Sequence, residues 1–252
     1  MAYNNYNLLC DEFFLDMYVN TELELPSGRD TILSFFERIQ KQFPSMLNFY
    51  RRDNNYYLEE DSSAGEYRWL VLEKCRIGSG VVNPASPECA FSQDRLILEL
   101  MPYMLGVNHL DVVSLDVTFG MDFDYKGSGD EVIAEALLGS SGFGSLFDLP
   151  GCRPIDLSPS VVVALSEDGR TQARVSIESR TGIYESGERD KADDKAISLY
   201  FTVRQYRYAD RKFDAQKSFE NQCRLAEELM AEKIVPYFVR PLTNIIAQKR
   251  FT

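Results

Sequence analysis

Residues 110–125, LDVVSLDVTFGMDFDY, carry the clearest structural signal in the chain. Apolar side chains recur at every second position from Val113 to Phe123, and mostly polar side chains lie between them. Successive side chains of a strand point to opposite faces of its sheet. The pattern therefore predicts a β-strand with one apolar face, which other elements cover, and one polar face.

Helical patterns flank this strand on both sides in the sequence. Residues 30–43 have helical spacing, with Ser27 and Asp30 expected to form a short capping box at the start. Ser92 is the expected N-cap of a second helix, which Pro102 should kink or shorten and Gly106 should end. A long helix is expected from about residue 215, kinked near its end by Pro236 and Pro241.

Further strands are expected on either side of these helices. Asp168-Gly169 is a tight-turn signal and predicts a hairpin between residues 161–165 and 174–178. The charged stretch 185–195 is expected to be a mobile loop. The remaining predicted strands are residues 8–25, 47–59, 67–82 and 196–208.

This order of elements predicts the fold class. Helices interleaved with strands and hairpins indicate an α+β protein with a mostly antiparallel sheet and helices on one face. Two arrangements remain open. The chain forms either one compact domain or two ferredoxin-like (split βαβ) halves, residues 1–126 and 127–252.

Composition and charge limit the partners and the compartment. The net charge of −12 disfavours nucleic acid and anionic membrane surfaces, and no apolar run is long enough to span a bilayer. Five scattered cysteines without a CxxC pair indicate reduced thiols rather than a disulfide framework. The N-terminus lacks the pattern of a signal peptide. We therefore expect a cytoplasmic protein.

Several stretches resemble one family of proteins. They are FFERIQKQFP at 35–44, LILELMPYMLGVNHLDVVSLDVTF at 96–119, and ISLYFTVRQY at 197–206 before the long helix. Together they resemble a sporadically distributed family of uncharacterised prokaryotic proteins of about this length. The resemblance implies architecture rather than chemistry, and a patchy distribution would suit a mobile-element or defence system.

Catalytic chemistry has few candidates. His109, the only histidine, lies two residues before Asp111, an arrangement more typical of a surface residue than of an acid–base pair. The segment RIGSG at 76–80 lacks phosphate-loop spacing and is expected to be a loop or flap. Asp116, Asp122 and Asp124 share one face of the central strand. They could hold Mg²⁺ in a phosphotransfer or nucleotide-processing enzyme.

Two stretches mix aromatic and cationic side chains, a combination found at protein interfaces and on single-stranded nucleic-acid surfaces. If their strands lie side by side, the two stretches form a single contact patch. The acidic composition favours a protein interface over nucleic acid. The candidate interface residues are Tyr50, Arg51, Arg52, Arg204, Tyr206, Arg207 and Tyr208.

The function predicted from the sequence is that of a non-enzymatic interaction or assembly protein. It needs no cofactor, and its partner is another protein or a second copy of the chain. The alternatives are the Mg²⁺-dependent enzyme that uses the aspartates and a nucleic-acid-binding protein that uses the Arg/Tyr stretches.

Overall fold

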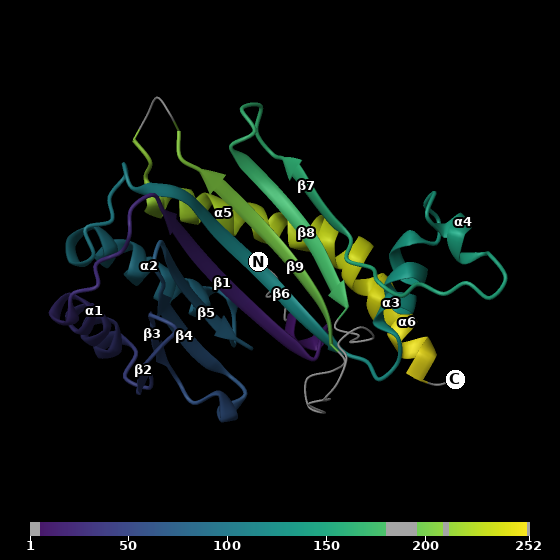
Figure 1. The fold of residues 1–252 in the computed structure, drawn as a ribbon, viewed down its shortest axis with the longest axis horizontal. Coiled ribbons are helices and arrows are strands. Elements are labelled where there is room, and N and C mark those ends of the chain that lie inside the picture. The colour runs from purple at the N-terminus through teal and green to yellow at the C-terminus, as the bar shows by residue number, and fades with distance from the viewer. Residues whose placement is uncertain (1–5, 180–195, 209–211, 251–252) are drawn as a thin grey trace.

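The protein is built around a single sheet of nine antiparallel strands, as the computed structural model shows for residues 6–179, 196–208 and 212–250. The predicted loop 185–195 lies outside the described residues. The strands follow the order β2-β3-β4-β5-β1-β6-β9-β8-β7 (Figure 1). Their bounds are β1 (Glu12–Thr21), β2 (Asn48–Arg52), β3 (Asn55–Glu59), β4 (Tyr67–Leu72), β5 (Arg76–Val82), β6 (Val112–Asp124), β7 (Ser160–Ala164), β8 (Thr171–Ser179) and β9 (Ala196–Tyr206).

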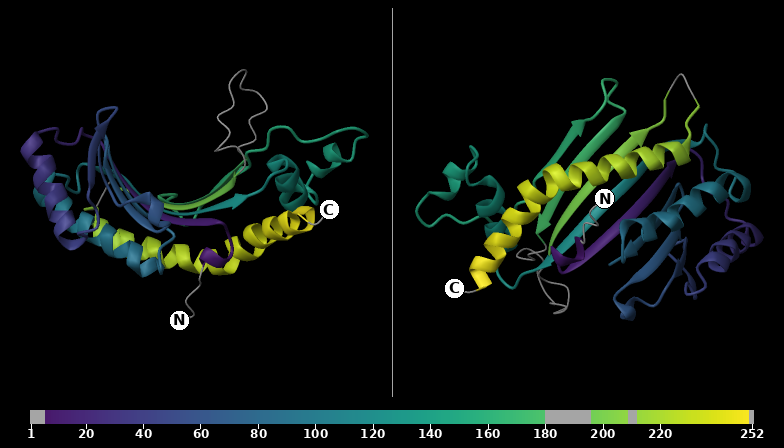
Figure 2. Two further views of the ribbon diagram at one scale, coloured as in Figure 1. Left: turned by 90° about the horizontal axis from the view of Figure 1, so that it is seen from below. Right: turned by 180° about the vertical axis from the view of Figure 1, so that it is seen from behind.

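The helices lie on one side of this curved sheet, its convex side (Figure 2). α1 and α2 cover the side of the sheet near β5, and the long C-terminal helix covers β6 and β9. The helical bounds are η1 (Tyr6–Leu8), α1 (Arg29–Gln42), η2 (Ser62–Ala64), α2 (Pro87–Met104), α3 (Gly129–Ile133), η3 (Ala134–Leu138), α4 (Gly144–Phe147), α5 (Ala215–Leu229), η4 (Met230–Val239) and α6 (Arg240–Arg250). The α+β class with helices on one face is confirmed.

The sheet is continuous, and two ferredoxin-like halves are not shown. β6 and β9 are paired from Ser114↔Tyr206 to Asp124↔Ala196, so the sheet continues across the expected division after residue 126. A single cluster of buried apolar side chains, contributed by both halves, fills the layer between sheet and helices.

The central strand β6 behaves as its alternation predicts. Leu115, Val117 and Phe119 are buried beneath the helices, and the Phe119 ring contacts those of Phe13 and Phe91. The polar positions of β6 point to the other face.

In α1, the apolar residues Ile32, Phe35, Phe36 and Ile39 are buried along one helical stripe.

Two helix starts differ from the prediction. α1 has Gly28 as its N-cap, without a side-chain bond, so Ser27 and Asp30 do not form a capping box. α2 begins at Pro87, six residues earlier than expected, because Ser86 caps it and proline is well suited to the first helical turn. It continues past Pro102 to Met104, and Gly106 adopts a left-handed conformation just beyond its end, as predicted.

The strand predictions 47–59 and 67–82 each prove to be a hairpin. Asp53 and Asn54 both have positive φ and form a tight turn between β2 and β3. The segment RIGSG belongs to β5, inside the sheet, and is neither a loop nor a flap. The C-terminal helix is π-helical over η4, which contains Pro236. Because proline cannot donate a backbone hydrogen bond, a local change of helical register there is expected.

Candidate functional site

The face of the sheet opposite the helices carries the candidate site. On the inner side of the curved sheet no described helix covers the strands (Figure 2). We call this surface the concave face. Its side chains line a cavity of about 590 Å³. The lining residues are Asp16, Tyr18, Arg76, Asp116, Thr118, Ser160, Val162, Gln172, Arg174, Ser176, Glu178, Tyr200, Thr202, Arg204 and Tyr206.

A charged pair lies at the centre of the concave face. The register of β6 and β9 places Asp116 opposite Arg204, whose Nε and Nη2 donate to the two carboxylate oxygens at 2.7 and 2.5 Å. Asp116 is only 4% exposed, and Asn20 Nδ2 also donates to it at 3.4 Å. The hydrogen bonds to Asp116 raise the pKa of Arg204. Arg204 is thus held in one orientation, beside the Tyr206 ring.

A second arginine is held in a similar way. Arg76 Nε and Nη2 donate to Glu73 at 2.8 Å each, and the guanidinium lies 4.8 Å from the centre of the Tyr18 ring. The hydrogen bonds to Glu73 raise the pKa of Arg76. Burial raises the pKa of the Tyr18 hydroxyl, which therefore stays protonated. The Tyr18 and Trp69 rings lie 6.0 Å apart. Both arginines are thus fixed against an aromatic ring before any ligand arrives.

Glycines allow these rings to lie close to the sheet. A Cβ at Gly78 would stand 2.9 Å from the Tyr18 ring, and a Cβ at Gly80 would stand 2.7 Å from Trp69 Nε1. The rings therefore occupy space that any other residue on β5 would fill. This close approach explains why a strand inside the sheet contains the sequence RIGSG.

Two carboxyl groups with raised pKa values lie near β5, one on each side of the sheet. Asp16 points to the concave face, and its buried Oδ1 has no hydrogen-bond partner among the described residues. Burial, and to a smaller extent Asp94, raise the pKa of Asp16 well above its ordinary value. Asp94 of α2 is on the helix side, where Ser79 Oγ donates to it at 2.5 Å. Burial raises its pKa to about 7. Asp16 therefore contributes to the cavity lining a carboxyl group whose pKa is raised and whose Oδ1 has no partner among the described residues.

The three predicted metal ligands are spread along one strand. Asp116 and Asp122 are six positions apart on β6, which corresponds to roughly 20 Å in a strand. Asp116 is already bound by Arg204, and Asp124 lies beyond Asp122 at the end of the strand. Within the described ranges, no three carboxylate, histidine or cysteine side chains are close enough together to hold a metal ion.

The two Arg/Tyr stretches are not neighbours. β2 forms one edge of the sheet, and five strands separate it from β9. Tyr50 stacks on Tyr57 at that edge, whereas Arg51 lies over the Tyr56 ring on the other side of β2. The strands that carry the two stretches do not lie side by side, so the stretches do not form one contact patch, and Arg52 is far from Arg204.

The other sequence candidates lie outside the concave face. Arg207 donates to the Leu110 carbonyl at 2.6 Å and is 3.6 Å from Glu22, beyond the end of β9. Tyr208 lines a separate cavity next to α5. Near the end of α2, His109 is partly buried, and the Asp111 carboxylate accepts from the Leu23 amide instead.

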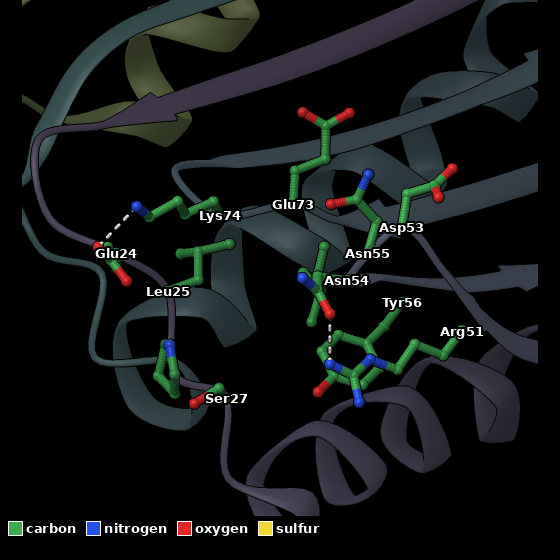
Figure 3. A pocket seen from close by; sticks show the side chains of 12 residues that line it. Glu24, Leu25, Ser27, Arg51, Asp53, Asn54, Asn55, Tyr56, Glu73 and Lys74 are labelled. Atoms are coloured by element: carbon green, nitrogen blue, oxygen red, sulfur yellow. Dashed lines mark hydrogen bonds and ion pairs between the residues drawn. The ribbon is translucent and has the colours of Figure 1, made fainter.

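A further cavity, of about 530 Å³, lies between the β2–β3 turn and the segment after β1 (Figure 3). Arg51 Nη2 donates to Asn54 Oδ1 at 2.7 Å, and Lys74 Nζ is 3.0 Å from Glu24. Arg51 and Lys74, the cations that line this cavity, are thus already bound by other residues that line it.

Sequence reasoning missed most of the concave face. Asp16 and Tyr18 share the polar side of β1 with Phe14 and Asn20, and the alternation in that strand is visible in the sequence. Arg174 and Tyr200 likewise alternate with buried residues on β8 and β9. Applying the two-residue period to every strand, and not only to β6, would have identified these positions.

The concave face combines fixed arginines, aromatic rings and hydroxyl groups, which suits hydrogen bonding and stacking with a ligand.

No helix among the described residues is long and apolar enough to cross a membrane. No protein-family model matches the chain, and neither does any curated protein or solved structure.

Proposed function

We propose that this chain is a non-enzymatic binding protein that holds a protein partner against its concave face. The observation that carries the proposal is the pair of fixed arginines, Arg76 and Arg204, each beside a tyrosine ring on an open face. Arginine, tyrosine and tryptophan dominate the binding energy of protein interfaces. Residues that are already held in place lose less conformational entropy on binding.

The remaining side chains of the cavity also fit a polypeptide. Thr118 and Thr202 join their hydroxyl groups at 2.8 Å, and Gln172 and Ser176 lie on the adjacent strand. These neutral groups can donate and accept hydrogen bonds, as backbone amides require. The proposal keeps the function predicted from the sequence and two of the predicted interface residues, Arg204 and Tyr206, but it replaces the others with residues of the concave face.

Arg174 provides the sharpest test of this proposal. Its side chain is exposed in the cavity, and within the described part of the chain no acidic group pairs with it. Arg174 Nε donates to Ser160 Oγ at 3.2 Å, so Arg174→Glu breaks no ion pair among the described residues but reverses the charge that a partner meets. We expect it to weaken partner binding by at least about tenfold, mainly because interface charges of the wrong sign are costly.

The control is Arg240→Glu, the same substitution at an exposed position on the helix side. A partner captured by the wild-type chain would be purified and titrated against both variants by calorimetry. Equal affinity for all three chains would contradict the proposal. Retention only of single-stranded nucleic acid, with a steep dependence on salt, would favour the nucleic-acid alternative instead.

A further inference from the structure

The edge strand β7 is the most exposed apolar strand of the sheet. All five of its residues are exposed, and Val161, Val162 and Val163 are 61%, 56% and 49% exposed. β7 pairs only with β8 and is the last strand of the described sheet; α4 lies further out on the same side (Figure 1). Three consecutive exposed valines on an open edge are unusual, because they favour pairing with another strand.

The hydrogen bonds of β7 show which of its backbone groups are unpaired. The Leu165 amide donates to the Thr171 carbonyl, and the Ile177 amide donates to the Pro159 carbonyl. Bonding alternates along an antiparallel strand, so the odd-numbered residues face β8. The amide and carbonyl groups of Ser160, Val162 and Ala164 therefore point away from the sheet.

This edge lacks the usual protection against pairing. Edge strands are commonly protected by charged residues, proline or a bulge. The opposite edge, β2, carries Arg51 and Arg52, followed by Asp53. β7 contains neither a charged residue nor proline, and its register with β8 is regular. β7 is thus less protected than β2 against pairing with another strand.

We propose that β7 pairs antiparallel with β7 of a second copy of this chain, with a two-fold axis through Val162. The outward groups of Val162 then bond to those of Val162 in the second copy. Ser160 bonds to Ala164 across the axis, and Ala164 to Ser160. The two sheets become one, and both concave faces open toward the same side.

The strand itself favours a second copy over another protein. Its sequence, SVVVA, is nearly symmetric about Val162, with a small residue at each end. A symmetric interface requires that the same patch complement itself, whereas an unrelated partner imposes no such symmetry. Val161 meets Val163 of the second copy on the helix side, so the exposed valines cover one another. Although each chain carries −12 net charge, no charge lies on the strand that must approach.

The first test compares molecular masses by sedimentation equilibrium over a wide range of protein concentration. The wild-type chain should approach twice 28.8 kDa, and Val162→Pro should remain at 28.8 kDa. Proline at this position removes the central outward amide but no bond to β8. Val162→Thr keeps both the amide and the branched shape, so it should still dimerise. Circular dichroism would verify that each variant is folded.

The second test fixes the register by cross-linking, with Cys152→Ser as background because Cys152 is exposed. Directly bonded antiparallel residues have Cα atoms about 5.5 Å apart, within disulfide range. Val162→Cys should therefore form a covalent dimer under mild oxidation. Ser160→Cys should not, because its copies lie roughly 13 Å apart along the strands. Ser160→Cys combined with Ala164→Cys should link again.

The outcomes separate clearly. The pairing is supported if Val162→Pro no longer dimerises and if cross-links form only at the predicted positions. A wild-type chain that stays at the mass of one copy at every concentration overturns it. A dimer that survives in Val162→Pro, or one that cross-links equally through Ser160→Cys, places the interface elsewhere and also overturns it. If Val162→Pro fails to fold, the cross-linking series decides.

Discussion

Replacing Asp94 by asparagine is expected to remove a large part of the pH dependence of stability. Asp94 is 3% exposed, and burial raises its pKa to about 7 from an ordinary value of 3.8. Between these two values the folded chain binds more protons than the unfolded chain, so its stability falls as the pH rises. The shift corresponds to roughly 4 kcal/mol of unfolding free energy, lost between about pH 4 and about pH 8.

The measurement is urea denaturation of the wild-type chain and of Asp94→Asn over this pH range. As the pH rises, the wild-type chain should lose roughly 4 kcal/mol of unfolding free energy relative to Asp94→Asn. Any constant cost of burying the amide beside Ser79 cancels in this comparison. Asp156→Asn, at an exposed position, should follow the wild-type curve. Parallel curves for Asp94→Asn would show that its carboxyl group titrates normally in the folded chain.

Removing Arg204 should destabilise the protein by about 2–3 kcal/mol, because it leaves the Asp116 carboxylate buried without its main donor. Breaking a buried pair usually costs more, but the Arg204 side chain is 41% exposed and water screens part of its charge. Asn20, at 3.4 Å, is too distant to replace two bonds from a guanidinium.

A double-mutant cycle tests this reasoning. Arg204→Ala combined with Asp116→Ala should be less destabilising than the sum of the single substitutions, because the double variant has no orphaned charge. The readout is the free energy of unfolding of the four proteins in urea at neutral pH. Strict additivity would mean that the two side chains do not interact in solution, despite their 2.7 and 2.5 Å contacts.

The local predictions succeeded where one strong physical signal decided the conformation. Alternation predicted β6, helical spacing predicted α1, and Asp168-Gly169 predicted the β7–β8 hairpin. They were wrong where two signals competed. Asp53-Asn54 was read as part of one long strand, although such residues tolerate positive φ and mark turns. The start of α2 was predicted at Ser92, although Ser86 followed by Pro87 is also a helix-start signal.

The candidate site was harder to predict because it depends on strand order. The sequence shows that Asp116 lies on the polar side of its strand. It does not show that Arg204, 88 residues later, lies directly opposite. The same order separates β2 from β9, which divides the predicted Arg/Tyr patch. It also makes β7 an edge, and so exposes three valines that would otherwise indicate a buried strand.

The sequence by itself determined which residues share a face of each strand, because side chains alternate with a period of two wherever a strand forms. It also determined the α+β class and the acidic surface. Only the tertiary structure decided which strands are neighbours, which edge is unprotected and which arginine meets which aspartate. The physical reason is that strand pairing is a contact between distant segments. Such contacts depend on the packing of the whole chain rather than on any local pattern.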